Sequence, residues 1–326
     1  MGPTGGFDSS DSHLRRVESG ITMDTPAISV RGLRKSYGAT EVLHGIDFDV
    51  HPGEVFGLLG PNGAGKTTTI EILEGYRERT AGAVSVFGAD PGRPTRAWRE
   101  QIGLVLQECE FDPLLTVVET LSLFSAFYRS PRPVDECVDL VGLGDRRNDR
   151  VGTLSGGQRR RLDVAVGLIG DPRLLFLDEP TTGFDPSARR GAWNMIEGLR
   201  TLGTTIFLTT HYMDEAQHLA DRLAILRDGE VVALGAPDEL VAGGMAETLV
   251  SFRLARPGEV DVMRPAVHGR LESSNGTVRL RTDDPQRTLY ELTSWAEREH
   301  VELDGLEATR PTLESVFLEL TGGNGG

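Results

Sequence analysis

Short apolar runs alternate with segments of helical periodicity along the first two thirds of the chain. The strand-like runs are IDFDV at 46–50, VFGLLG at 55–60, LLFLDEP at 174–180 and TIFLTTH at 205–211, and the last three are almost continuously apolar. Runs of this length and composition are typical of strands buried on both faces, as in a parallel or mixed sheet covered by helices. The pattern therefore predicts an α/β fold.

A mostly helical stretch, about 108–172, lies between the apolar runs at 55–60 and 174–180. Apolar positions recur at helical spacing in LLTVVETLSLFSAFY at 114–128, and Pro131 and Pro133 interrupt the pattern. This stretch predicts a helical subdomain inserted in the α/β unit.

The pattern changes after residue 237. The strand-like segments ETLVSFRLA and TVRLRT, the second preceded by an Asn275-Gly276 turn, are followed by a helix near 285–299, a strand near 301–307 and a helix over 311–320. We therefore predict a flexible tail over 1–26, a nucleotide-binding domain over 27–237 and a small α/β accessory domain over 238–326.

The last predicted helix has one apolar face, formed by Leu313, Val316, Phe317 and Leu320. This face could pack on the accessory domain's own sheet, on the preceding domain or on a second subunit. The spacing of the residues leaves these alternatives open.

Composition disfavours several classes of function without identifying one. No apolar run approaches the roughly 20 residues of a membrane helix, so we expect no segment to cross a bilayer. A net charge of −15 disfavours nucleic acid and anionic lipid surfaces as partners. Cys109 and Cys137 form no metal-ligand or disulfide spacing, which fits a reducing compartment. Lysine occurs only at positions 35 and 66.

The second of these lysines lies in GPNGAGKTT at 60–68, which matches the phosphate-loop pattern between an apolar strand and a predicted helix over 67–74. Backbone N–H groups in such a loop face phosphate oxygens, and the helix N-terminus favours the same negative charge. Lys66 would contact the β- and γ-phosphates of ATP, and the Thr67 hydroxyl would ligate Mg²⁺. The predicted phosphate-binding residues are Gly60, Pro61, Asn62, Gly63, Ala64, Gly65, Lys66, Thr67 and Thr68.

Two acids end the apolar run LLFLDEP. Taken alone, such a pair is more often a solvated strand edge or a helix cap, but a phosphate loop on the same sheet favours a catalytic role. Asp178 would hold Mg²⁺, and Glu179 would orient and deprotonate the attacking water.

The segment LSGGQRRRLDVA at 154–165 resembles the signature motif of ABC ATPases. The resemblance implies that Ser155, Gly156, Gly157 and Gln158 face the γ-phosphate of ATP bound to the opposite subunit, at a helix N-terminus. Ser155 also matches a local capping box with Gln158, and the two interpretations are compatible.

The resemblance covers about 28–237 and implies further site residues. Tyr37 would stack on adenine, and Gln107 would reach the metal and the water and link the core to the helical subdomain. His211 would contact the γ-phosphate, and Asp185 would communicate across the dimer. The segment around Asp185 departs from many relatives, which carry Ser and Leu where this chain has Thr182 and Phe184.

The resemblance also implies a fold and a partner. The fold is a P-loop NTPase cassette, with a mixed sheet core and a helical subdomain, followed by the accessory domain. A γ-phosphate held by one subunit's loop and the other's signature requires two chains, so a homodimer with two composite ATP sites is predicted.

Three kinds of ABC protein are considered: a transporter ATPase, a translation- or DNA-repair-associated ATPase, and an accessory ATPase of metal-cluster assembly. The resemblance implies that translation-type members usually carry two tandem cassettes and that repair-type members carry long inserted coiled coils. The chain has neither a tandem cassette nor a long coiled coil, and its acidic charge disfavours nucleic acid. PTLESVFLELTG at 311–322 resembles the ending of daunorubicin-resistance ATPase subunits of ABC-2 exporters.

This ending favours a transporter. We predict an ATP-hydrolysing subunit that powers efflux of a drug-like or lipophilic substrate through separate ABC-2 membrane subunits. It would lie at the cytoplasmic face of the cell membrane and associate with the membrane only through that permease. The alternative is a soluble ABC ATPase uncoupled from transport.

Overall fold

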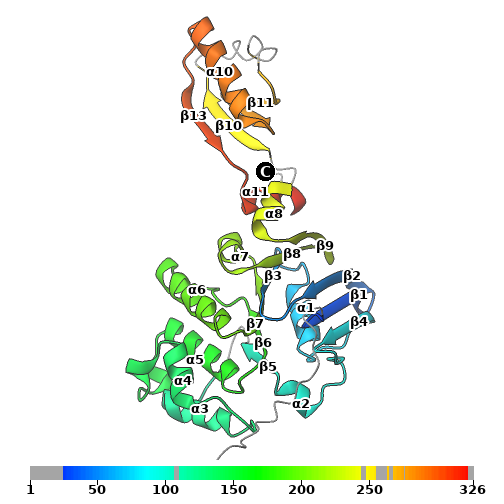
Figure 1. Cartoon of the computed structure of the whole chain (residues 1–326), viewed down its shortest axis with the longest axis vertical. Coiled ribbons are helices and arrows are strands. Elements are labelled where there is room, and N and C mark those ends of the chain that lie inside the picture. Colours follow the sequence, from blue (N-terminus) through cyan, green and yellow to red (C-terminus); the bar gives the residue numbers. More distant parts are fainter. Residues whose placement is uncertain are drawn as a thin grey trace, which may run out of the picture.

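The computed structural model describes residues 25–105, 110–243, 247–254, 263, 267–274 and 276–321. A six-stranded sheet forms its centre, in the order β5-β6-β7-β3-β8-β9 (Figure 1). The strands are β3 (Val55–Leu59), β5 (Ile102–Val105), β6 (Leu174–Asp178), β7 (Thr205–Thr210), β8 (Arg222–Arg227) and β9 (Glu230–Gly235).

Neighbouring strands of this sheet run parallel, except that β9 is antiparallel to β8. Every residue of β3, β6 and β7 is buried, because helices or a second sheet cover both faces of these strands. The mixed sheet predicted from the three apolar runs is confirmed, and those runs lie side by side at its centre.

A second sheet of three antiparallel strands packs against the first, in the order β2-β1-β4. Its strands are β1 (Ile28–Tyr37), β2 (Thr40–Val50) and β4 (Ala81–Val86). The Phe48 ring on β2 stacks on those of Phe56 and Phe207 in the larger sheet, at centroid distances of 5.4 and 6.0 Å. The sequence indicated only the end of β2, so this sheet was not predicted.

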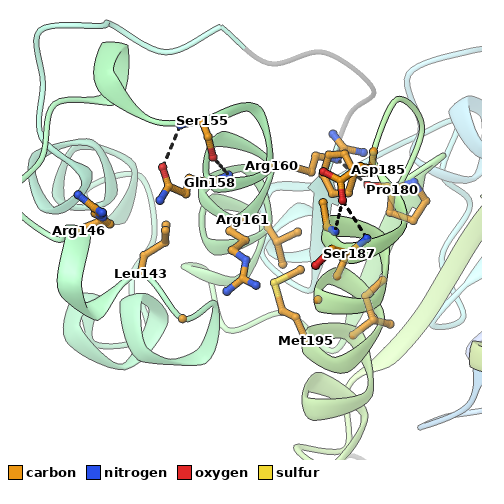
Figure 2. Close-up of a pocket in the computed structure, with 18 residues that line it drawn as sticks. Leu143, Arg146, Ser155, Gln158, Arg160, Arg161, Pro180, Asp185, Ser187 and Met195 are labelled. Atoms are coloured by element: carbon orange, nitrogen blue, oxygen red, sulfur yellow. Dashed lines mark hydrogen bonds between the residues drawn. The ribbon is translucent and has the colours of Figure 1, made fainter.

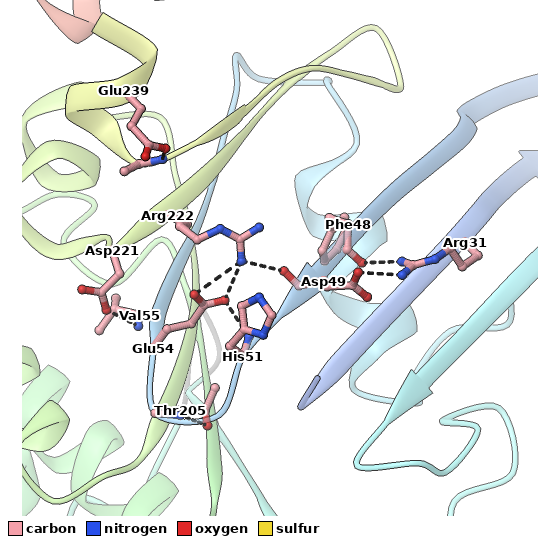
Figure 3. A network of polar contacts seen from close by, with 12 residues as sticks. Arg31, Phe48, Asp49, His51, Glu54, Val55, Thr205, Asp221, Arg222 and Glu239 are labelled. Atoms are coloured by element: carbon pink, nitrogen blue, oxygen red, sulfur yellow. Dashed lines mark hydrogen bonds and ion pairs between the residues drawn. The ribbon is translucent and has the colours of Figure 1, made fainter. Parts of the chain in front are cut away.

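A polar network also joins the two sheets (Figure 3). Arg222 Nη1 at the start of β8 lies 3.2 Å from both the Asp49 carbonyl oxygen and Glu54 Oε1. The Asp49 carboxylate accepts a hydrogen bond of 2.6 Å from Arg31 on β1. A single arginine therefore links the second sheet to the turn that leads into β3.

The helices of this part of the chain surround the central sheet. They are α1 (Lys66–Leu73), α2 (Arg96–Arg99), α3 (Val117–Ser125), α4 (Val134–Leu140), α5 (Gly156–Leu168), α6 (Pro186–Arg200), α7 (Met213–Leu219) and α8 (Pro237–Gly243), with short 3₁₀ turns η1 (Gly144–Arg146) and η2 (Val151–Thr153).

The predicted helical stretch contains α3, α4 and α5, which gather at one end of the molecule (Figure 1). Their apolar side chains form one cluster that includes Val117, Leu121, Val138 and Leu162. The apolar pattern began at residue 114, but α3 begins after Thr116, whose side chain forms a capping box with Glu119.

A four-stranded antiparallel sheet follows α8, in the order β11-β12-β10-β13. Its elements are β10 (Thr248–Arg253), β11 (Arg270–Ser274), β12 (Thr277–Thr282), α10 (Pro285–Glu299) and β13 (Asp304–Thr309). The predicted strand near 301–307 thus forms slightly later. Gly276 lies between β11 and β12 with φ 78°, as the turn prediction requires, whereas Asn275 lies outside the described residues.

Helix α10 supplies the core of this small unit by packing Leu292 and Trp295 against Val250 and Phe252 of β10. Figure 1 shows the unit projecting from the rest of the molecule beyond α8. No helix in the described part of the chain is long and apolar enough to cross a bilayer.

The last helix, α11 (Leu313–Thr321), does not pack on the small sheet. Leu313 and Phe317 are buried in a cluster with Leu59 of β3, Ala216 of α7 and Ile225 of β8. After the small sheet, the chain therefore returns to pack on the central sheet. Of the alternatives left open by the sequence, the structure shows packing on the preceding domain.

Candidate ATP site

The loop between β3 and α1 folds in the way that phosphate binding requires. Gly65 adopts φ 108° at the N-terminus of α1, and a Cβ on Gly60 would lie 2.5 Å from the Leu226 carbonyl oxygen. Lys66 is buried, and its Nζ donates to the carbonyl oxygens of Gly60 at 2.8 Å and Pro61 at 3.2 Å. Thr67 and Thr68 are less buried, with Thr67 exposed at the helix N-terminus.

Three predicted site residues meet at the carboxyl ends of β3, β6 and β7. Lys66 Nζ lies 3.5 Å from Glu179 Oε1, and His211 Nδ1 lies 3.3 Å from the same oxygen. Because the carboxyl ends of parallel strands meet at one edge of a sheet, residues far apart in sequence converge there. The arrangement provides a lysine for phosphate, a carboxylate for water and a histidine beside it.

The surroundings keep Glu179 ionised. Burial raises its pKa, but the charges of Lys66 and His211, with the hydrogen bond from Thr182, lower it to below the ordinary value. Its backbone has φ 45°, in the left-handed region that non-glycine residues rarely occupy. A strained residue in a cluster of charged groups is characteristic of a reactive site.

Asp178 precedes Glu179 and is more deeply buried. Burial raises the pKa of Asp178, and the hydrogen bond from the Thr209 hydroxyl and the charge of Lys66 offset this only in part. A buried carboxylate with a raised pKa gains from a bound cation, which would favour its ionised form.

Two threonines that were not among the predicted site residues orient these acids. The Glu179 amide donates to Thr209 Oγ1 at 3.1 Å, and Thr182 Oγ1 donates to Glu179 Oε2 at 3.1 Å. Thr209 and Thr210 are polar residues that follow the apolar centre IFL of the strand TIFLTT, a signal that could have identified Thr209.

The Thr67 hydroxyl and the Asp178 carboxylate are hard oxygen ligands, which suit Mg²⁺. The described residues contain no group of three or more His, Cys, Asp or Glu placed to hold a metal ion. Mg²⁺ commonly takes only one or two protein ligands and completes its shell with phosphate and water, so the donor set fits it. Gln107, predicted as a third contact to metal and water, lies outside the described residues.

The signature segment begins α5 as the resemblance implied. Ser155 Oγ accepts from the Gln158 amide at 3.3 Å, and Gln158 Oε1 accepts from the Ser155 amide at 2.9 Å. The predicted capping box is therefore confirmed. Gly156 is exposed beside Ser155, so the helix N-terminus is open to an anion.

Asp185 caps the next helix, accepting from the amides of Ser187 at 2.8 Å and Ala188 at 3.0 Å. Figure 2 shows the capped ends of α5 and α6 facing each other across a cleft of about 430 Å³. A neighbouring cleft of about 760 Å³ is lined by Ser155, Gly156, Glu179 and Asp185 among others. Of the described residues, neither the phosphate loop nor Tyr37 lines this second cleft.

Tyr37 ends β1 with its ring 41% exposed. Lys35 Nζ lies 4.9 Å and Arg77 Cζ 5.2 Å from the ring centroid, so two cations flank the aromatic face. An exposed ring held in this way is available to stack on a planar base.

Comparison with known proteins identifies a family for both parts of the chain. Residues 43–182 match the ABC transporter family model, and 248–312 match the model of an ABC transporter domain-containing protein-like C-terminal domain. The first match contains the phosphate loop, the signature segment and both acids. The second contains most of the small four-stranded unit.

Close relatives match over nearly the whole chain. Nod factor export ATP-binding protein I of Rhizobium sp. (strain N33) is 40% identical over 92% of this chain and 98% of the relative. The daunorubicin/doxorubicin resistance ATP-binding protein DrrA of Streptomyces peucetius is 37% identical over 92% of this chain and 94% of the relative.

Solved structures resemble the larger part. An ATP-binding subunit of an ABC transporter, 27% identical, matches with a TM-score of 0.59 over 67% of this chain and 92% of its own. A dimeric ATP-binding cassette in a post-hydrolysis state with ADP and phosphate, 25% identical, matches with a TM-score of 0.57 over 64% of this chain and 98% of its own. The chain belongs to the ATP-binding, ATP-hydrolysing subunits of ABC exporters.

Proposed function

We propose that this chain uses ATP hydrolysis to power efflux of a drug-like or lipophilic substrate through a separate ABC-2 permease. The observation that carries the proposal is the convergence of Lys66, Glu179 and His211 at one edge of the central sheet. This arrangement can bind a γ-phosphate and activate a water beside it.

Each member of the cluster has a distinct role in the proposal. Glu179, ionised and adjacent to the γ-phosphate position, accepts a proton from the attacking water. Lys66 leaves its loop carbonyls to contact the phosphates, and His211 orients the water and the γ-phosphate. Thr67 and Asp178 would hold Mg²⁺, which neutralises phosphate charge.

The completed site requires a second copy of the chain. The open N-terminus of α5 lines a cleft with Glu179, but that cleft does not include the phosphate loop of the same chain. In a C2 dimer, Ser155, Gly156 and Gly157 of one chain would face ATP on the phosphate loop of the other. The dimeric cassette among the similar structures supports this arrangement.

The names of the relatives support export and leave the cargo open. One relative is named for Nod factor export and another for daunorubicin and doxorubicin resistance. A lipophilic substrate is the chemistry that we propose here. The chain would act at the cytoplasmic face of the membrane, held there by its permease.

The permease would bind an exposed apolar patch on the helical subdomain, formed by Leu114, Leu123 and Phe127. Their exposed fractions are 69%, 52% and 65%, whereas Val117 and Leu121 on the other face of α3 are buried. The region after residue 110 therefore contributes both a core face and a free face. We assign permease binding to the exposed face.

We predict that Leu123→Glu combined with Phe127→Glu abolishes co-purification of the proposed ABC-2 membrane subunit and abolishes efflux, while ATPase activity persists. Leu202→Glu, at an exposed apolar position outside the patch, is the matched control and should leave all three unchanged. Equal loss of ATPase activity would assign the patch to the subdomain core. Unchanged co-purification would place the permease elsewhere.

A further inference from the structure

Glu215 is a fully buried acid on α7 that the proposed reaction does not use. Its Oε1 accepts a 2.8 Å hydrogen bond from Thr181 Oγ1 and a 3.2 Å hydrogen bond from Trp193 Nε1. A buried carboxylate is costly to desolvate, so these donors must stabilise it. The two donors come from different elements.

The contacts join the two segments that carry the reactive side chains. Thr181 follows Glu179 by two residues and is fully buried, and the next residue, Thr182, donates to Glu179 Oε2. On the other side, α7 begins immediately after the segment that carries His211. Glu215 therefore forms a side-chain connection between the Glu179 segment and the His211 segment, in addition to the bond from the Glu179 amide to Thr209.

Electrostatics supports a firm connection. Burial raises the pKa of Glu215, and the hydrogen bonds from Thr181 and Trp193 oppose this. The nearby guanidinium of Arg189 also favours the charged form.

The positions of Glu179 and His211 depend on contacts of this kind. Glu179 has an unfavourable backbone conformation with φ 45°, which persists only where surrounding contacts enforce it. The 3.3 Å separation of Glu179 Oε1 and His211 Nδ1 depends on how the two segments are held.

We propose that Glu215 is a positioning residue that sets the distance between Glu179 and His211 through its hydrogen bond with Thr181. It controls turnover of bound ATP without contacting the nucleotide. The inference rests on the roles proposed above for Glu179 and His211. Misplacement of a reacting group by about 1 Å can cost on the order of 10²-fold in rate, so the effect belongs to kcat.

The test uses Thr181→Val, which keeps side-chain shape and removes the donor. We expect kcat to fall at least about tenfold while KM and the ATP dissociation constant stay unchanged. Thr181→Ser restores the hydroxyl and should recover most of the lost kcat. Trp193→Phe is the matched control, because it removes a donor to the same oxygen from α6 and leaves the Glu179 segment in place.

A double variant tests whether Glu215 acts through Thr181. Glu215→Ala with Thr181→Val should be no slower than the slower single variant, because residues of one connection are not additive. If Glu215→Ala does not fold, the comparison of Thr181→Val, Thr181→Ser and Trp193→Phe still decides. Wild-type kcat in Thr181→Val, or an equal kcat loss in Trp193→Phe, would overturn the inference.

Glu179→Gln separates this inference from the proposed function. If Glu179→Gln hydrolyses ATP at the wild-type rate, the proposed reaction fails. If that variant is inactive and Thr181→Val is normal, only the role of Glu215 fails.

Discussion

Glu179 illustrates how residues outside the reaction prepare one that takes part in it. Lys66 and His211 approach its carboxylate from the segments that follow β3 and β7, and Thr182 and Thr209 hold its side chain and backbone. The carboxylate is thereby ionised and directed at the space beside Lys66, where a γ-phosphate would bind.

The first prediction separates binding from chemistry. Glu179→Gln should keep ATP affinity and lose roughly 10² to 10⁴ in turnover, because a positioned base contributes about that much. Lys66→Ala should instead weaken ATP affinity itself, since its charge contacts phosphates in the ground state. Turnover and equilibrium binding of nucleotide measure the two effects. Wild-type turnover in Glu179→Gln, or unchanged affinity in Lys66→Ala, would contradict these roles.

The second prediction concerns Cys137, which is buried in the core of the helical subdomain as its small apolar side chain suggests. Burial raises the pKa of its thiol to about 11. At pH 8 only about one part in a thousand would be the reactive thiolate even if it were accessible. In a Cys109→Ser background, thiol titration should be slow for the native protein and fast after unfolding. Rapid reaction of the native protein would exclude this burial.

At the scale of elements, capping decides where helices begin. Thr116 with Glu119 and Ser155 with Gln158 each form a capping box, and these short polar patterns precede apolar helical runs. At α5 the same residues form the local cap and the predicted contact to the partner's ATP. A local structural role and a proposed functional one would therefore coincide in Ser155.

Helix α11 shows that a local sequence pattern can predict an apolar helix face without predicting the surface that it packs against. Its apolar face was evident from the spacing of Leu313 and Phe317, but its partner was not, because the surface it covers comes from β3, α7 and β8. Part of that surface belongs to α7, the helix that follows His211. The last helix therefore belongs to the central core by its packing, although the small sheet precedes it in sequence.

The third prediction tests this packing. Phe317→Ala should destabilise the protein by about 3 kcal/mol, as large-to-small changes in a core do. Leu318→Ala on the exposed side of the same helix, 45% exposed, should change stability by no more than about 0.5 kcal/mol. Denaturant unfolding measures both. Equal small effects would mean that α11 does not pack on the central core.

Truncation after residue 240 has a related expectation. The truncation removes α11 and exposes Ile225 and Ala216, so the free energy of unfolding should fall. Any change in turnover should accompany this loss of stability. Comparison with Phe317→Ala separates loss of α11 packing from loss of the small four-stranded unit. Unchanged stability, ATP-dependent dimerisation, turnover and transport in the truncated chain would exclude a regulatory role for the C-terminal region.

Over the whole molecule, the sequence predicted those features that depend on contiguous motifs or on strong hydrophobic periodicity. The phosphate loop, LLFLDEP and the signature segment each identified local structure and candidate chemistry. It did not predict the three-stranded sheet, whose strands β1 and β4 lack a continuous apolar run because one face is partly exposed. The sequence also did not indicate the roles of Thr182 and Glu215, because their hydrogen bonds to Glu179 and Thr181 form only in the folded chain.

The molecule also presents its predicted site in two halves. In the proposed dimer, Lys66, Glu179 and His211 of one chain form one half, and the open N-terminus of α5 at Ser155 of the other chain forms the second. Closure of two chains around ATP and opening after hydrolysis would be a two-state motion, which a permease can use.

The most direct test of this account is the molecular mass of Glu179→Gln with ATP and Mg²⁺, measured by sedimentation or light scattering with bound nucleotide counted. We predict a dimer that holds one ATP per chain and returns to monomer in ADP. Addition of Ser155→Arg to the same variant, which blocks the α5 N-terminus and leaves the phosphate loop intact, should leave ATP bound to a monomer. ATP-bound Glu179→Gln that stays monomeric, or an equally stable dimer with Ser155→Arg, would contradict the composite site.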